Sequence, residues 1–154
     1  MKNHFSFPKA SRRDLLRACM CGVSVSAGSA LRMSGYSARV RSLGWSADGE
    51  YLATSGYEQL ILWPFGGKDG PMGRQPKLMA AGAARVSVVA CHPKQPVVAV
   101  GFADGAVVLV RTDDGALISA REPDQQPVGA LGWDASGQQL AFGTENGEAG
   151  LLAL

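Results

Sequence analysis

Few residues of this chain are of the types that bind metals or transfer protons. The histidines are His4 and His92, and the cysteines are Cys19, Cys21 and Cys91. Structural zinc sites use paired ligands at regular spacing, which one Cys-x-Cys and a distant Cys-His do not provide. Acid/base catalysis needs a histidine or carboxyl group held beside a reacting partner, whereas His92 precedes a proline in a turn. We therefore expect no metal, no cofactor and no enzymatic activity.

One glycine- and proline-rich stretch, residues 65–76, carries the charged residues Lys68, Asp69 and Arg74. A loop that binds phosphate normally leads into the N-terminus of a helix. No helical pattern follows this stretch. We interpret it as a surface loop that could contact a partner, because long loops on rigid scaffolds often carry recognition.

Charge is distributed unevenly along the 154 residues. Residues 1–41 contain eight basic side chains and one acid, whereas residues 42–154 contain seven basic and twelve acidic side chains. The mildly acidic larger part argues against nucleic-acid binding, which needs clustered Lys and Arg. No stretch reaches the ~18 apolar residues of a membrane span, so we expect no integral membrane insertion.

The larger part of the chain repeats one pattern three times. Its copies begin at Val40, Val86 and Val128, which are 46 and 42 residues apart. Each copy reads as short apolar strands separated by turns such as Asp-Gly and Asn-Gly, which favour hairpins. Residues 77–80 and 116–119 are candidates for an additional outer strand. A period of roughly 40–45 residues is typical of a four-stranded propeller blade.

The motifs within these copies resemble those of WD-repeat β-propellers. Trp45 and Trp133 precede turns, Leu62-Trp63 ends a strand as the signature Trp does, and Asp104 begins a blade turn. Gly35-Tyr36 stands where the family often has Gly-His. The resemblance implies an all-β fold, a partial propeller of about three four-stranded antiparallel blades at about 35–80, 81–122 and 123–154. We expect Trp45, Trp63, Asp104 and Trp133 to stabilise these blades.

Neighbouring blades must share a core, because one blade cannot bury its faces alone. Cys91 stands where the other copies have Trp, so we interpret it as a small buried apolar residue rather than a reactive thiol. The residues predicted to be buried are Val40, Trp45, Leu52, Val86, Val98, Val128, Trp133 and Leu140.

The resemblance also implies a non-catalytic scaffold that binds protein partners on the loop-rich face around the central channel. Arg39 and Arg85 precede the first strands of their copies at equivalent positions. We predict that they form a binding pair, although a role in stabilising the blades fits equally well. Lys68 and Arg74 of the 65–76 loop are further partner-binding candidates.

Residues 1–34 do not read as a blade. The run 11–16, Ser-Arg-Arg-Asp-Leu-Leu, resembles a twin-arginine export signal and precedes a weakly apolar stretch. The alternative is a basic leader of a shortened chain, in which residues 29–34 are the remnant of an outer strand. We favour a cytoplasmic scaffold. The alternative is an exported periplasmic propeller that resembles bacterial propellers assisting envelope machinery.

Three blades are too few to close a propeller ring. Propellers usually join about 4–8 blades and so hide their strand edges. Three blades leave two open faces, which favour association. We expect either a C-terminal fragment of a larger propeller or self-association, in which a second copy pairs with the first to approximate a six-bladed ring.

Overall fold

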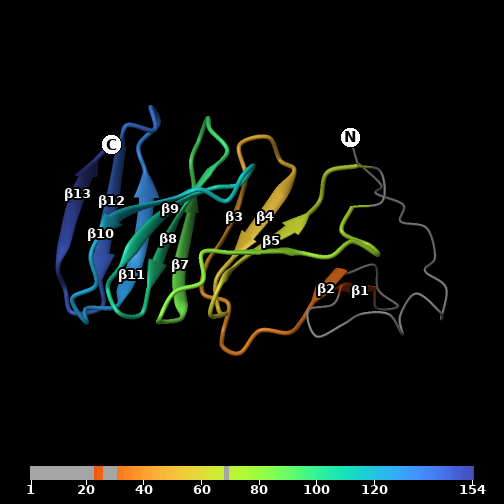
Figure 1. The fold of residues 1–154 in the computed structure, drawn as a ribbon, viewed down its shortest axis with the longest axis horizontal. Helices are drawn as coiled ribbons and strands as arrows, with labels where there is room; N and C mark the ends of the chain where they lie inside the picture. Colours follow the sequence, from red (N-terminus) through yellow and green to blue (C-terminus); the bar gives the residue numbers. More distant parts are fainter. Residues whose placement is uncertain (1–22, 26–30, 68–69) are drawn as a thin grey trace, which may run out of the picture.

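The computed structural model describes residues 23–25, 31–67 and 70–154, and every regular element in these ranges is a β-strand. None of the described residues forms a helix that is long and apolar enough to cross a membrane. Figure 1 shows three antiparallel sheets standing side by side, with a small two-stranded sheet beside the first of them.

The first sheet, blade 1, contains β3 (Leu43–Trp45), β4 (Tyr51–Thr54), β5 (Leu60–Pro64) and β6 (Lys77–Met79) in that order. Blade 2 contains β7 (Val86–Cys91), β8 (Val97–Phe102), β9 (Val107–Arg111) and β10 (Leu117–Arg121). Short hairpin turns account for most of this sequential pairing, whereas the longer loop 65–76 joins β5 to β6. The outer strands predicted at 77–80 and 116–119 are thus confirmed as β6 and β10.

Blade 3 contains β11 (Val128–Trp133), β12 (Gln139–Thr144) and β13 (Ala149–Ala153). It has three strands among the described residues, so the sheets of 4, 4 and 3 strands together agree with the partial propeller expected. Of the residues predicted to be an outer-strand remnant, 31–33 form β2 (Leu31–Met33), which pairs with β1 (Val23–Val25) in a separate sheet. No described blade strand is paired with β2, so it does not extend any of the three blades.

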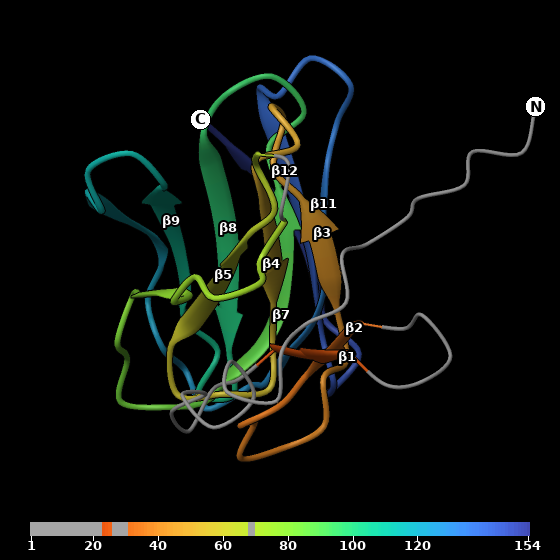
Figure 2. The same cartoon turned by 90° about the vertical axis from the view of Figure 1, so that its right-hand side faces the viewer.

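The first strands of the three blades, β3, β7 and β11, lie next to one another, with β7 in the middle. Figure 2 shows them gathered together, while β9 lies away from them. The sheets therefore meet at their inner strands and pack face to face, as propeller blades do.

Two apolar cores fill the spaces between the blades. Val98 and Val100 of β8 face blade 1, whereas Ala99 between them faces blade 3. Alternate side chains point to opposite faces of a strand, so a strand covered on both sides is apolar at every position. Blade 2 is therefore the best-covered blade.

The burial predictions hold for the residues that lie between described blades. Leu52, Val86, Val98, Val128 and Leu140 are buried, as expected. The predictions for Val40 and Trp45, which are exposed, and for Trp133, which is half-buried, are wrong.

Trp133 is half-buried, Trp45 is 52% exposed and Val40 is 40% exposed. Trp133 packs against blade 2. In blade 1, Gly44 approaches Cys91 of blade 2, so Trp45 next to it lies on the opposite face, where its ring contacts Phe65 edge-on. Val40 precedes β3 and has no neighbouring blade on its side among the described residues. The repeated pattern predicts which face a residue occupies but not whether another blade covers that face.

Candidate functional site: an arginine-lined pocket at the inner strands

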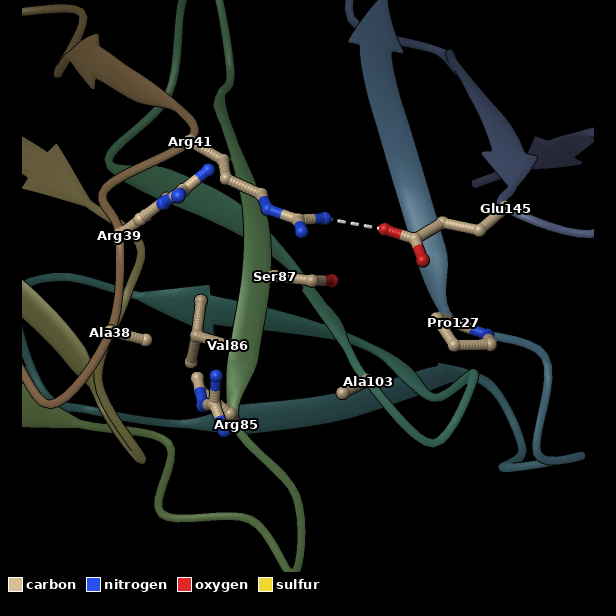
Figure 3. A pocket seen from close by; sticks show the side chains of 9 residues that line it. All are labelled: Ala38, Arg39, Arg41, Arg85, Val86, Ser87, Ala103, Pro127 and Glu145. Atoms are coloured by element: carbon tan, nitrogen blue, oxygen red, sulfur yellow. Dashed lines mark hydrogen bonds and ion pairs between the residues drawn. The ribbon is translucent and has the colours of Figure 1, made fainter.

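A pocket of about 470 Å³ opens where the chain enters the inner strands. Residues from all three blades line it, so it exists only because the blades are assembled. Figure 3 shows three arginines and one glutamate around it. The lining residues are Ala38, Arg39, Arg41, Arg85, Val86, Ser87, Ala103, Pro127 and Glu145.

Backbone hydrogen bonds hold the segments that carry these side chains. The Ala38 N–H donates to the Gly56 carbonyl at 3.0 Å, and the Val86 N–H donates to the Tyr57 carbonyl at 2.9 Å. In blade 3 the Glu145 N–H donates to the Pro127 carbonyl at 2.8 Å. The connections into the inner strands are thus bonded to turns between second and third strands. The pocket wall is preorganised by the blades themselves.

Gly56 makes the close approach on the blade 1 side possible. Its φ is +97°, and a Cβ there would lie 2.8 Å from the Arg39 carbonyl oxygen. Only glycine adopts this conformation without strain. Gly56 therefore fixes the backbone that presents Arg39.

The pocket is cationic. Arg41 extends across β7 and forms an ion pair with Glu145 at 2.5 Å, which links blade 1 to blade 3 (Figure 3). Both side chains are exposed, so the pair adds little stability and can open at small cost. The guanidinium groups of Arg39 and Arg85 have no ionic or hydrogen-bonding partner among the residues that the structure describes. The pocket is therefore lined by two unpaired arginines, Arg39 and Arg85, and by Arg41, whose charge Glu145 neutralises.

The structure places Arg39 and Arg85 on the same pocket, as their equivalent sequence positions predicted. It separates them from Arg74. The loop after β5 is bonded to Glu50, since the Phe65 and Gly66 N–H groups both donate to the Glu50 carbonyl. Glu50 lies beyond the C-terminal end of β3, whereas the pocket lies before its N-terminal end.

Arg74 donates a hydrogen bond to the Gly66 carbonyl inside its own loop. Lys68 lies outside the described residues. The loop and the arginine pocket are therefore two separate surfaces, at opposite ends of blade 1.

Sequence reasoning missed Arg41 and Glu145. Arg41 lies two residues after Arg39, and Glu145 begins the turn between the second and third strands of its copy. The segment before the first strand and the turn between the second and third strands lie at the same end of every antiparallel blade. A charged residue in either segment could therefore have been predicted to lie near Arg39 and Arg85.

The residues expected to stabilise the blades, among them Trp63, form hydrogen bonds within and between blades. Trp63 is fully buried, and its Nε1–H donates to the Tyr36 hydroxyl at 2.8 Å. That hydroxyl lies 2.9 Å from Thr54 Oγ1. Tyr36 thus takes part in a side-chain network at the position where a histidine is common.

Asp104 and Trp133 connect neighbouring segments. The Asp104 carboxylate accepts the Ala106 N–H at 3.1 Å, and its carbonyl accepts the N–H groups of Asp124 and Gln125. The Trp133 Nε1–H donates to the Ala90 carbonyl of blade 2 at 3.0 Å.

Cys91 and His92 are held by burial and hydrogen bonds within the fold. Burial raises the pKa of the Cys91 thiol to about 11, so the thiol stays protonated and unreactive at neutral pH. His92 is buried, its Nδ1 accepts the N–H groups of Lys94 and Gln95, and its Nε2 lies 3.1 Å from the Gly137 carbonyl. In the described ranges no three His, Cys, Asp or Glu side chains gather as metal ligands. Cys19 and Cys21 lie outside those ranges.

Comparison with known proteins supports the propeller. Residues 89–154 match the family described as the anaphase-promoting complex subunit 4 WD40 domain. The crystal structure of the computationally designed Ika4 protein is similar in fold, with a TM-score of 0.63 and 16% sequence identity, over 89% of this chain and 87% of that one. No curated protein matches the chain significantly. Repeat spacing, sheet topology and the family match over residues 89–154 together support a WD-repeat β-propeller fold for this chain.

Proposed function

We propose that this protein is a non-catalytic scaffold that binds an acidic segment of a protein partner in the arginine pocket. WD40 domains generally bind protein partners, and their families are generally non-catalytic. One observation supports the choice of this surface. Arg39 and Arg85 lie unpaired, within the described part of the chain, on a pocket of about 470 Å³ whose backbone is held by hydrogen bonds.

Chemistry favours an acidic ligand. A guanidinium donates several hydrogen bonds in a fixed fork that matches a carboxylate. Arg41 already binds a carboxylate at this site, that of Glu145. A partner carboxylate can bind Arg39 or Arg85 directly, or replace Glu145 on Arg41.

The experiment compares captured partners of three forms of the protein. Wild type, the Arg39→Ala/Arg85→Ala double variant and Arg74→Ala are used to capture proteins from an extract of the source cells, which are then quantified. Hydrogen bonds to charged groups contribute about 1.5–3 kcal/mol, so losing two should reduce capture by about tenfold or more. Arg74→Ala is the matched control, because it removes an exposed arginine from the opposite end of blade 1.

An unchanged set of partners in the double variant, with circular dichroism showing an intact fold, would exclude the pocket. Loss of capture in Arg74→Ala alone would assign binding to the loop after β5 instead.

A second candidate function is that of a propeller exported from the cytoplasm. The Arg12-Arg13 pair and the weakly apolar stretch that follows it support an exported propeller that acts on the cell envelope. These residues lie outside the described ranges. A fusion of residues 1–38 to a reporter that is active only after export tests this: activity that disappears in Arg12→Lys/Arg13→Lys supports export, and no activity in wild type excludes it.

The larger ring expected from the sequence also stays a proposal. Its support is that β3 of blade 1 and the outward face of blade 3 both expose apolar side chains.

A further inference from the structure

Two sheet faces at the ends of the blade row are open. On blade 1, Leu43 is 60% and Trp45 is 52% exposed. Met33 and Tyr36 pack over another part of this face, around Ile61 and Trp63, so the uncovered area is centred on β3. At the other end of the row, blade 3 exposes Ala130, Gly132, Ala141 and Leu151 on the face opposite blade 2.

The two interfaces within the chain follow one rule at their inner strands. The last residue of each inner strand packs on the next-to-last residue of the inner strand before it. Cys91 ends β7, and its Sγ lies 3.3 Å from the position that a Cβ on Gly44 would occupy. Trp133 ends β11, and its indole donates to the Ala90 carbonyl. In both cases a small residue makes room for a larger one.

The open faces contain the two unused halves of the same contact. Trp45 ends β3, and Gly132 is the next-to-last residue of β11. A Cβ added to Gly132 would meet nothing within 4 Å, so the space above it is empty. Leu43 is the register equivalent of Leu131, which packs against the core between blades 2 and 3.

We propose that two copies of this chain assemble head to tail into a closed six-bladed ring, with Trp45 of each copy packed on Gly132 of the other. The proposal goes beyond the scaffold function and does not depend on the arginine pocket. A second copy is the occupant that continues the observed blade-to-blade interface with the same residue types in the same register. Six blades lie within the range in which propellers close.

A two-fold ring contains this contact twice, and each contact buries a tryptophan. Aromatic side chains bury about 150–250 Å² each and dominate interface energetics. Closure also removes both exposed apolar faces, so association ends at two copies instead of continuing as a filament.

The test uses a pair of charged variants in the full chain. In the monomer, Trp45→Arg replaces an exposed side chain and Gly132→Glu extends into empty space, so both variants should fold. Sedimentation analysis should give wild type a mass twice the 16.1 kDa of the chain. Each variant alone should be a monomer.

An equimolar mixture of the two variants should regain the double mass. In the mixed ring, one interface keeps the original Trp45 and Gly132. The other interface places the introduced arginine of one chain opposite the introduced glutamate of the other, so the opposite charges attract across the contact. Neither variant can form this combination with itself.

Leu117→Arg is the matched control, since Leu117 is 53% exposed on the outer strand β10 and should leave the dimer intact. A wild-type monomer at tens of micromolar would overturn the proposal. So would a dimer that both charged variants leave intact, or a series of larger species, which would show open rather than closed association.

Discussion

Single residues decide what each blade exposes. Trp45, Cys91 and Trp133 occupy one position of the repeat, yet they differ in burial because their neighbours differ. Tyr36 shows the same principle in a hydrogen-bond network. It lies where the WD-repeat pattern often has histidine, and its hydroxyl joins Trp63 to Thr54. The repeat pattern predicted the position of this residue, but only the structure shows that its hydroxyl contacts Trp63 and Thr54.

The hydroxyl of Tyr36 should contribute measurably to stability. Tyr36→Phe leaves the buried Trp63 Nε1–H without its acceptor, which costs about 1–3 kcal/mol for an unsatisfied buried group. Urea denaturation followed by circular dichroism measures the change. Tyr57→Phe is the control, because Tyr57 packs in the same cluster. Equal stability of the two variants would contradict the role assigned to the network.

At the scale of elements, the turns explain which residues that the repeat groups together also lie together in space. Strand order, the outer strands and the paired position of Arg39 and Arg85 follow from repeat register. The grouping of Arg74 with these arginines does not hold in space, because each strand reverses direction and puts the loop after β5 at the other end of the blade. Counting strand reversals would have separated them.

Gly56 should be needed for the pocket wall. Gly56→Ala combines a left-handed φ with a Cβ placed 2.8 Å from a backbone oxygen. Gly49 also has a positive φ, +72°, but open space around it. Gly49→Ala should therefore cost about 1 kcal/mol and Gly56→Ala clearly more, by urea denaturation. Similar losses in both would show that the approach to Arg39 is not tight.

Two equivalent turns use serine and aspartate in exchanged positions. Ser46 donates to Asp48 in blade 1, and Ser136 donates to Asp134 in blade 3. Tyr51 N–H donates to Ser46 Oγ, whereas Gln139 N–H donates to the Asp134 carboxylate. The side-chain hydrogen bond from Ser136, with that from the Gln139 backbone, lowers the pKa of Asp134 to about 2.

This lowered pKa predicts an acid effect. The carboxylate stabilises the fold above its unfolded pKa of about 3.9, and the contribution is lost as pH falls towards 2. Asp134→Asn should therefore lower the melting temperature at pH 6 and narrow its difference from wild type at pH 2. A difference that stays constant over this range would contradict the assignment.

The whole molecule is a row of blades whose inner strands converge, and its pocket and open faces both result from that arrangement. Sequence periodicity predicted the blades because packing repeats with the residues that repeat. It could not predict the exposure of Trp45, since that depends on what stands beyond blade 1. Nor did it predict the Arg41–Glu145 pair, which joins residues 104 positions apart across β7.

The central claim is that the arginine pocket binds carboxylates of a partner. The most direct measurement is an NMR titration of the labelled protein with a hexaglutamate peptide, following the arginine Nε–H resonances at two salt concentrations. If the pocket binds carboxylates, the resonances of Arg39 and Arg85 should shift saturably, and less at high salt, while that of Arg74 stays unchanged. Shifts confined to Arg74, or equal shifts of all exposed arginines, would contradict it.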